Sequence, residues 1–478
     1  MEEMNTEKEE QTGAKQSHIL VFSFPVQGHI NPMLEFSKRL ASKGQRVTLV
    51  TTTKASKSLQ VGDPITSFGC NLKVEFISDG TEQADQGSGA SKDLFELLKS
   101  ATTKSLAKLI TNIKNSNDAT EKYPLKFLVY DYIMPWALDV ARQHGMDGAP
   151  FYPTSSGVAA LYYQFLEGTL KLPLREGQPA TLPSMPPLEL NDLPTFLSDL
   201  DLYPLLLKLT AHIPNLREVK WIFHTTFDKL ESEVLESMAS HGLPVRAIGP
   251  TVPSMFLDKR LEDDKDYGLN LLKPDEENCM KWLDSKETGS VVYASFGSLS
   301  NLSKEEVEEL ASCLTNCSYY FLWVVRETEK EKLPEKFLDE ITRKGLVVSW
   351  CKQLSVLAHK AVGCFVTHCG WNSTLEALSL GVPMVGLVAV PDQFDHPTIA
   401  KYVADVWKAR VRVKVNEKVG FATRGEIAMC IRHVMDKEKG MEVRNASLVW
   451  KELAKEAMYE GGSSDKNIEE FVAALQLI

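Results

Sequence analysis

The segment HCGWNSTLEALSLGVP at residues 368–383 places polar side chains where a strand gives way to a helix. The strand GCFVTH ends at His368, and we expect the helix to start near Ser373 or Thr374. Backbone N–H groups and the dipole at a helix start favour a bound anion. Gly370 lets the backbone come close to such an anion. The segment therefore predicts a cradle for a phosphate-like group.

Neighbouring side chains indicate that this anion belongs to a nucleotide. Asn372 and Ser373 add hydrogen-bond donors. Glu376 lies one helical turn after Asn372 and faces the same end of the helix, where a carboxylate suits vicinal hydroxyls rather than phosphate. Trp350 ends the preceding strand and offers a flat face at the same sheet edge. Each residue alone is more simply a helix cap or a core residue, so the prediction of a nucleoside diphosphate site rests on their combination.

A second candidate site lies in FPVQGHINP at residues 24–32. A hydroxyl group is a poor nucleophile at neutral pH and needs a base beside it. His29 follows the first strand, and a neutral histidine can accept a proton at working pH. Asp131 ends the strand KFLVYD at the same sheet edge, where it can orient the imidazole. Taken alone, His29 is equally well explained as a residue at the start of a helix, and Asp131 as the cap of the helix that follows it.

Both candidate sites lie within a repeating pattern of apolar strands and amphipathic helices. In the first half, strands are expected at 18–25, 46–52, 72–77, 126–131, 149–154 and 221–226. The pattern restarts at 290–297, 320–325, 345–350, 363–368, 382–388 and 409–415. Continuous apolar strands separated by helices predict parallel sheets covered on both faces. The expected fold class is α/β, with two Rossmann-like, doubly wound parallel-sheet domains facing a cleft.

Changes in composition set the expected domain boundaries. A chain of 478 residues is too long for one ordinary core, which favours two domains of about 200 residues each. We expect, in order, a disordered tail at 1–17, a first domain at 18–250, a linker at 251–277, a second domain at 278–455 and, at 456–478, a C-terminal helix that returns to the first domain.

Charge and cysteine usage narrow the range of functions. A formal net charge of −11 without a basic stretch argues against a nucleic-acid partner, and an anionic ligand must be held by local dipoles and a few side chains. The eight cysteines show no zinc-ligating spacing, and no run of about 18 apolar residues can span a membrane. We expect a cytoplasmic protein, and a monomer because no sustained heptad stands out.

The segment 350–393 is similar over its whole length to the donor-binding signature of plant family 1 UDP-dependent glycosyltransferases. The resemblance continues in FPVQGHINPMLEFSKRL, VYDYIMPWALDVA and GSVVYASFGSL, and so covers nearly the whole chain. It implies the GT-B fold, with the acceptor bound by 18–250 and the UDP-sugar by 278–455. The UDP-sugar, most simply UDP-glucose, would be a co-substrate, with no metal or other cofactor. The chain looks most like members that glucosylate small carboxylic acids, steroids and triterpenoids.

The resemblance also assigns roles to individual residues. It maps a catalytic base and its partner onto His29 and Asp131, which would act by displacement with inversion at the anomeric carbon. The implied UDP-sugar contacts are Trp350 and Cys351 for uracil, Gln353 and Glu376 for ribose, Ser298, His368, Gly370, Asn372 and Ser373 for the diphosphate, and Trp371, Asp392 and Gln393 for the sugar. Two Asp-x-Asp triplets, at 199–201 and 264–266, end no strand, so we expect neither to hold a metal.

The sequence departs from the family pattern at the end of the signature, where Val390 replaces an aromatic residue. Counting from the start of the signature gives Asp392 and Gln393 as the final pair, which we adopt. Counting back from PTIAKYVADVW gives Asp395 and His396 instead. In this family a final Gln is associated with glucose and a final His with galactose or pentose donors. Galactosyl or pentosyl transfer therefore stands as the alternative to glucosyl transfer.

Other functions have less support. A nicotinamide-dependent oxidoreductase needs G-x-G-x-x-G and an α/β-hydrolase needs G-x-S-x-G, and both strings are absent. A catalytically inactive nucleotide-sugar-binding scaffold remains, although the presence of both His29 and Asp131 argues against it. The expected acceptors are small apolar molecules such as steroids, triterpenoids, flavonoids or phenolic and carboxylic acids, most simply attacked through a hydroxyl.

Overall fold

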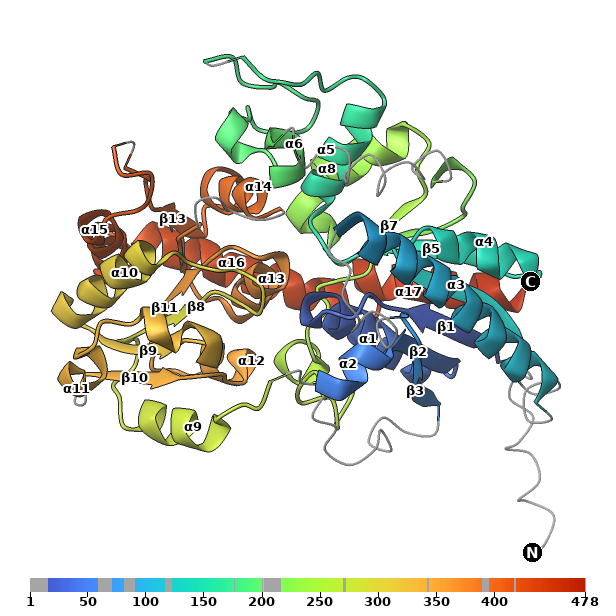
Figure 1. Cartoon of the computed structure of the whole chain (residues 1–478), viewed down its shortest axis with the longest axis horizontal. Coiled ribbons are helices and arrows are strands. Elements are labelled where there is room, and N and C mark those ends of the chain that lie inside the picture. The colour runs from blue at the N-terminus through green and yellow to red at the C-terminus, as the bar shows by residue number, and fades with distance from the viewer. Residues whose placement is uncertain are drawn as a thin grey trace, which may run out of the picture.

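The structure is a computed structural model that describes residues 16–58, 71–80, 91–116, 123–175, 177–199, 201, 216–269, 272–341, 344–388, 395–416 and 418–477. Within these residues two parallel sheets with flanking helices lie side by side, one in each half of the chain (Figure 1). The predicted α/β fold class with two parallel-sheet domains is confirmed. In the same residues, no helix is both long and apolar enough to cross a membrane.

The first sheet has the strand order β3-β2-β1-β4-β5-β6-β7 within the described residues, and its pairings are parallel. Its strands are β1 (His18–Phe22), β2 (Arg46–Thr52), β3 (Leu72–Ile77), β4 (Leu125–Asp131), β5 (Asp147–Tyr152), β6 (Ile222–His224) and β7 (Val245–Ala247). Its helices are α1 (Gln27–Ser42), α2 (Thr53–Ser58), α3 (Ser91–Asn115), α4 (Trp136–Gln143), α5 (Ser156–Leu166), α6 (Thr195–Ser198) and α8 (Asp228–Ser240). Every residue of β1 is buried, which explains its continuous apolar sequence.

The second sheet has the order β10-β9-β8-β11-β12-β13 in the described part of the chain, again with parallel pairings. Its strands are β8 (Val291–Ser295), β9 (Tyr320–Val324), β10 (Gly345–Val348), β11 (Val362–Thr367), β12 (Met384–Gly386) and β13 (Arg410–Arg412). Its helices are α9 (Glu276–Asp284), α10 (Lys304–Asn316), α11 (Phe337–Glu340), α12 (Gln353–Leu357), α13 (Trp371–Leu380), α14 (His396–Lys401), α15 (Arg424–Met435) and α16 (Met441–Met458). Both reciprocal hydrogen bonds of the capping box between Ser303 and Glu306 are present at the start of α10.

Three local boundaries differ from the sequence prediction. Helix α13 begins at Trp371, two residues before Ser373, because the backbone at Gly370 is extended and its carbonyl already accepts the first helical hydrogen bond. The first strand ends at Phe22 rather than at residue 25, and helix α1 begins at Gln27, so His29 lies in the first helical turn. Strand β10 ends at Val348, which places Trp350 in the loop that follows. Each of these boundaries moves by only a few residues along the chain.

The last helix, α17 (Ser463–Gln476), lies on the first domain although it follows the second in sequence (Figure 1). Its Phe471 is fully buried. The ring packs on Phe127 and Phe223 of the first sheet, at centroid distances of 5.1 and 4.9 Å, and on Phe36 of α1 at 6.4 Å. The helix therefore ties the end of the second domain to the core of the first.

We expect Phe471→Ala to lower the free energy of unfolding by about 3–5 kcal/mol, because it removes a fully buried aromatic ring and leaves a cavity. Urea unfolding followed by tryptophan fluorescence measures this. Leu477→Ala is the control, since Leu477 is 90% exposed in the same C-terminal segment. Equal stability of the two variants would contradict the role of α17 in the first core.

Candidate active site

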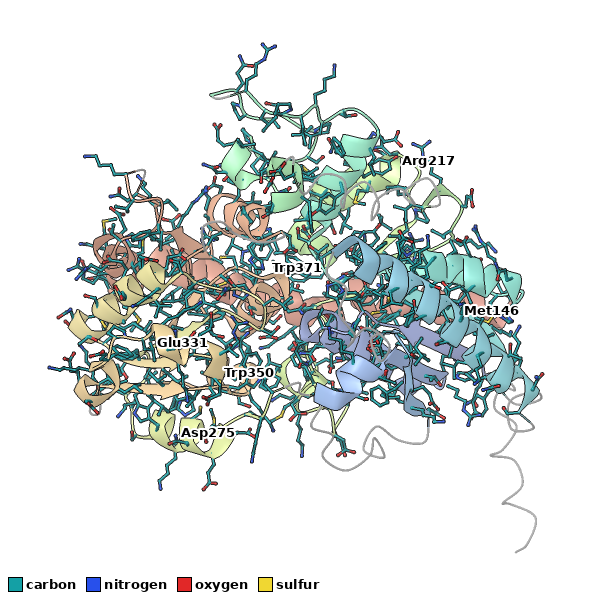
Figure 2. The ribbon with its side chains drawn as sticks, viewed as in Figure 1. Met146, Arg217, Asp275, Glu331, Trp350 and Trp371 are labelled. Carbon is teal, nitrogen blue, oxygen red and sulfur yellow. The ribbon has the colours of Figure 1, made fainter. Side chains whose placement is uncertain are left out.

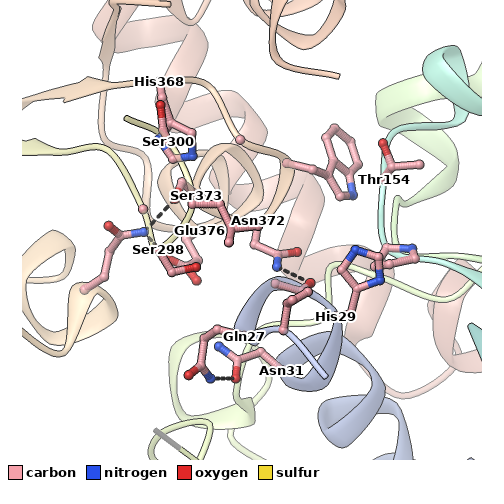
Figure 3. Close-up of a pocket in the computed structure, with 18 of the residues that line it drawn as sticks. Gln27, His29, Asn31, Thr154, Ser298, Ser300, His368, Asn372, Ser373 and Glu376 are labelled. Carbon is pink, nitrogen blue, oxygen red and sulfur yellow. Dashed lines mark hydrogen bonds between the residues drawn. The ribbon is translucent and has the colours of Figure 1, made fainter. Parts of the chain in front are cut away.

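The carboxyl ends of both sheets meet at a cavity of about 590 Å³ that is lined by residues of both domains. In each sheet the strand order reverses beside a central strand, between β1 and β4 and between β8 and β11. Such switch points leave a crevice at the strand ends, where α/β sheets bind ligands. The predicted site residues that line the cavity are His29, Ser298, Trp350, Cys351, Gln353, His368, Gly370, Trp371, Asn372, Ser373 and Glu376. Figure 3 shows His29 of the first domain close to Asn372 of the second.

His29 and Asp131 form a hydrogen-bonded pair at the switch point of the first sheet. His29 Nδ1 lies 2.6 Å from Asp131 Oδ2, and because a carboxylate only accepts, the imidazole N–H donates. The Asp131 side chain is fully buried, whereas that of His29 is 22% exposed and lines the cavity. The backbone N–H groups of Phe24 and Ile133 also donate to Asp131, at 3.2 and 3.3 Å. The pair thereby leaves His29 Nε2 as a proton acceptor.

The start of helix α13 lies across the cavity from this pair. Gly370 is its N-cap residue, so the backbone N–H groups of the first turn have no partner within the helix. The side chain of Asn372 donates from Nδ2 to the carbonyl oxygen of Gly28 at 2.6 Å. Gly28 directly precedes His29 in the first turn of α1. One hydrogen bond thus joins the start of α13 to the start of α1, which carries His29.

Glu376 is the centre of a hydrogen-bond network on α13. Gln353 Nε2 donates to Glu376 Oε2 at 2.7 Å and to Ser373 Oγ at 2.8 Å. The hydroxyl of Tyr267 donates to Glu376 Oε1 at 2.8 Å. Burial raises the pKa of Glu376 to about 7, while the bonds from Gln353 and Tyr267 favour the ionised form. The ionised carboxylate is a strong acceptor for a diol facing the cavity.

His368 follows β11 at the switch point of the second sheet, and its side chain is neutral. Its burial, followed by the neighbouring ring of His396 at 4.7 Å between centroids, holds the pKa of His368 well below its usual range. At neutral pH it can therefore offer a polar N–H to a phosphate but not a full positive charge. Nearby, Arg326 donates to the carbonyl oxygens of Ser298 and Ser300 and so fixes the loop after β8 beside the cavity.

Comparisons with known proteins agree with this geometry. Residues 18–443 match the family described as UDP-glucoronosyl and UDP-glucosyl transferase. The chain belongs to this family. It is 48% identical to mogroside I-E synthase of Siraitia grosvenorii over 96% of this chain and 98% of that protein, and 46% identical to UDP-glycosyltransferase 74E1 of Arabidopsis thaliana with the same coverage.

A solved structure with the same fold supports the assignment. Os79 from O. sativa in complex with UDP superposes with a TM-score of 0.84 at 36% identity, and the match covers 96% of this chain and 100% of Os79. The predicted resemblance to plant UDP-dependent glycosyltransferases and the GT-B fold are thus confirmed. The protein is a UDP-glycosyltransferase.

Within this glycosyltransferase site, the Trp371 side chain also makes a contact between the two domains. Its indole is 3% exposed, and Nε1 donates to Thr225 Oγ1 of the first domain at 2.8 Å. The ring also packs on Trp407 at 6.0 Å. The side chain therefore joins the two domains, and Figure 2 shows it between them, while Trp350 lies at the end of the second sheet. Trp371 also lines the cavity.

The structure describes one of the two candidate sugar-reading pairs. Asp392 and Gln393 lie outside the described residues. Asp395 and His396 line the cavity, at the start of α14. Asp395 Oδ2 accepts a hydrogen bond from Thr154 of the first domain.

Several residues at this site escaped sequence reasoning. Arg326 donates to backbone carbonyl oxygens of a loop far from it in sequence. Tyr267 belongs to the segment between the domains and donates to Glu376, and Lys352 pairs with Asp266 of that segment. No spacing rule connects such residues. In the triplet at 264–266, Asp264 pairs with the buried Lys38 of α1 rather than facing the cavity. Among the described residues, no group of three or more His, Cys, Asp or Glu is arranged to hold a metal ion.

We expect Gly370→Ala to weaken UDP binding at least tenfold, because an added Cβ would lie 2.3 Å from His368 Nε2 and force that ring to move. Isothermal titration of UDP measures the dissociation constant. Gly425→Ala is the matched control, since its Cβ would meet only Thr423 Oγ1, at 3.9 Å. Unchanged UDP affinity in Gly370→Ala would show that the position of His368 is irrelevant to the diphosphate.

Proposed function

We propose that this enzyme transfers a hexose, most simply glucose, from a UDP-sugar to a hydroxyl of a small apolar acceptor with inversion of the anomeric centre. The observation that carries the proposal is the His29–Asp131 pair, 2.6 Å apart, facing the start of α13 across one cavity. A base beside a nucleophile and an anion cradle for a leaving group are the two parts that such a displacement needs.

The chemical steps follow from this geometry. His29 Nε2 removes the proton of the acceptor hydroxyl as that oxygen forms a bond to the anomeric carbon. The bond between the anomeric carbon and the diphosphate oxygen breaks on the opposite face, and its electron pair leaves with UDP. Asp131 stabilises the imidazolium that forms. The first turn of α13 and the neutral His368 stabilise the negative charge on UDP with preorganised dipoles.

The acceptor would occupy the part of the cavity formed by the first domain. Its lining there is mostly aromatic and aliphatic: Phe24, Phe95, Tyr132, Ile133, Pro153, Val158, Tyr162 and Phe196. A flat or polycyclic apolar molecule fits such walls, and the proposed classes are steroids, triterpenoids, flavonoids and phenolic or carboxylic acids. The names of the relatives, mogroside I-E synthase among them, support the triterpenoid class most directly.

We assign recognition of the donor sugar to Asp392 and Gln393, the final pair when the signature is counted from its start. Asp395 and His396 are the alternative pair: both line the cavity, and the carboxylate of Asp395 accepts a hydrogen bond from Thr154 on the acceptor side. The relative named UDP-glucosyltransferase 74AE2 of Panax ginseng supports glucose. UDP-galactose or a UDP-pentose is the second candidate, because a His at this position is associated with those donors.

Mass spectrometry of reactions with UDP-glucose, UDP-galactose and UDP-xylose and a panel of the proposed acceptors tests the function. We expect His29→Ala to lower kcat by about 10²–10⁴-fold, because the acceptor loses its base, while the UDP dissociation constant stays unchanged. Asp131→Asn should act in the same direction. His433→Ala, on the exposed face of α15, should retain full activity.

The outcomes separate the possible readings. Turnover of a UDP-sugar by the unmodified protein excludes the inactive scaffold, and the preferred donor decides between glucose and the alternatives. Full turnover by His29→Ala would remove the base while leaving the enzyme intact. Binding of UDP without turnover of any donor would favour the scaffold.

A further inference from the structure

A residue of the segment between the two domains is part of the wall around the proposed nucleotide site. Tyr267 lies between β7 and α9, lines the cavity and donates its hydroxyl to Glu376 Oε1 at 2.8 Å. Gln353 donates to the other oxygen, Oε2. The carboxylate that would accept the ribose hydroxyls is therefore held from two sides, once from its own domain and once from the linker.

The linker around Tyr267 is anchored to helix α1. The buried ammonium of Lys38 donates to Asp264 Oδ1 at 2.7 Å, to the backbone carbonyl of Asp266 at 2.8 Å, and to Glu35 Oε1 at 2.6 Å. Near the start of the same helix, Gln27 Nε2 donates to the carbonyl oxygen of Leu269 at 2.7 Å. These bonds lie on both sides of Tyr267 in sequence. Its backbone is thus fixed relative to the helix that carries His29.

The same linker is anchored to the loop that would hold the base of the nucleotide. Lys352 Nζ forms ion pairs with Asp266 Oδ2 at 2.9 Å and with Glu276 Oε2 at 2.7 Å. The backbone N–H of Asp275 donates to the carbonyl oxygen of Trp350 at 3.0 Å. The linker therefore contacts the loop at Trp350, the carboxylate of Glu376 and helix α1, which carries His29.

We propose that Tyr267 is a positioning residue of the donor site, which orients the Glu376 carboxylate toward the ribose and connects donor binding to helix α1. The inference rests on the proposed function in taking Glu376 as the ribose acceptor. It adds a linker residue as the support for that acceptor. Without the hydroxyl of Tyr267, Glu376 keeps one donor from Gln353 and loses the other.

The ionisation of Glu376 gives the proposal a signature that a structural role would not give. The other titratable groups beside this carboxylate are Tyr267 on the linker, Tyr293 on β8 and Cys351 after β10. Burial raises the pKa of the two tyrosines, and a hydrogen bond with Cys279 together with burial raises that of Cys351. These three groups stay neutral below about pH 9. Glu376, with a pKa of about 7, is the group among them that titrates near neutrality.

Loss of the Tyr267 hydroxyl should raise the pKa of Glu376 further, because one bond to its ionised form is lost. The variant then protonates Glu376 at higher pH than the wild type does. The UDP dissociation constant of the Tyr267→Phe variant, divided by that of the wild type, should therefore be small at pH 9, where Glu376 is ionised in both proteins. This ratio should grow as the pH falls through 7. Titration of the UDP phosphates is common to both proteins and cancels in the ratio.

Isothermal titration of UDP against the full-length protein and Tyr267→Phe, from pH 6.5 to 9, tests this. We expect Tyr267→Phe to raise the dissociation constant about tenfold at neutral pH and less at pH 9. Tyr459→Phe is the matched control, because its ring is 46% exposed, outside the cavity. Equal affinity of wild type and Tyr267→Phe, or a ratio that does not change with pH, overturns the role of Tyr267 while leaving the proposed function in place. Absence of UDP binding by the wild type overturns both.

Hydrogen exchange of the unmutated protein is a second test that does not depend on the folding of a variant. UDP should slow exchange in the linker peptide 264–269 as well as at the start of α13. Protection confined to the second domain would contradict the coupling through the linker.

Discussion

The hydrogen bond from Asn372 Nδ2 to the carbonyl oxygen of Gly28, 2.6 Å long, sets the separation of the two halves of the site. On one side of it, the next residue is His29, the proposed base; on the other, the first turn of α13 exposes its N–H groups. Each helix start follows a central strand at the carboxyl edge of a parallel sheet. Two sheets wound in this way can only bring these helix starts together if their strand ends face each other. The remaining interdomain contacts, such as Trp371 on Thr225, hold that orientation.

An acidic protein that binds a diphosphate must rely on local groups, and the structure shows how few of them carry a full charge. His368 is held neutral by burial, so its contribution is that of a dipole. Arg326 donates hydrogen bonds to the carbonyl oxygens of Ser298 and Ser300 and thereby orders that loop. Backbone N–H groups at the start of α13 then supply the preorganised part of the stabilisation. Such a site loses little free energy to reorganisation when negative charge moves onto the leaving group.

The sequence predicts the parts of this arrangement that are local. Strand ends, the helix after β11 and the placement of His29 and Asp131 at adjacent strand ends follow from periodicity and from the parallel topology. The start of α13 was expected two residues late, because the extended backbone at Gly370 has no signal beyond glycine itself. Tyr267 and Arg326 could not be found in this way, since each acts on atoms at least 26 residues away along the chain. The choice between Asp392 and Asp395 depends on which end of the signature is counted from, and periodicity alone does not decide it.

Helix α1 shows why the linker cannot be treated as a passive connection. Glu35, Lys38 and Arg39 are nearly fully buried, although the helical pattern alone would place them on a solvated face. Their burial is possible because the linker supplies partners, Asp264 for Lys38 and Asp258 for Arg39, the latter through two bonds of 2.6 and 2.8 Å. A buried ion pair contributes little net stability, but removing one partner is costly, so such pairs define one position of the chain strongly. The linker is thereby fixed against helix α1, which carries His29, and the groups that it contacts in the second domain are held in place with it.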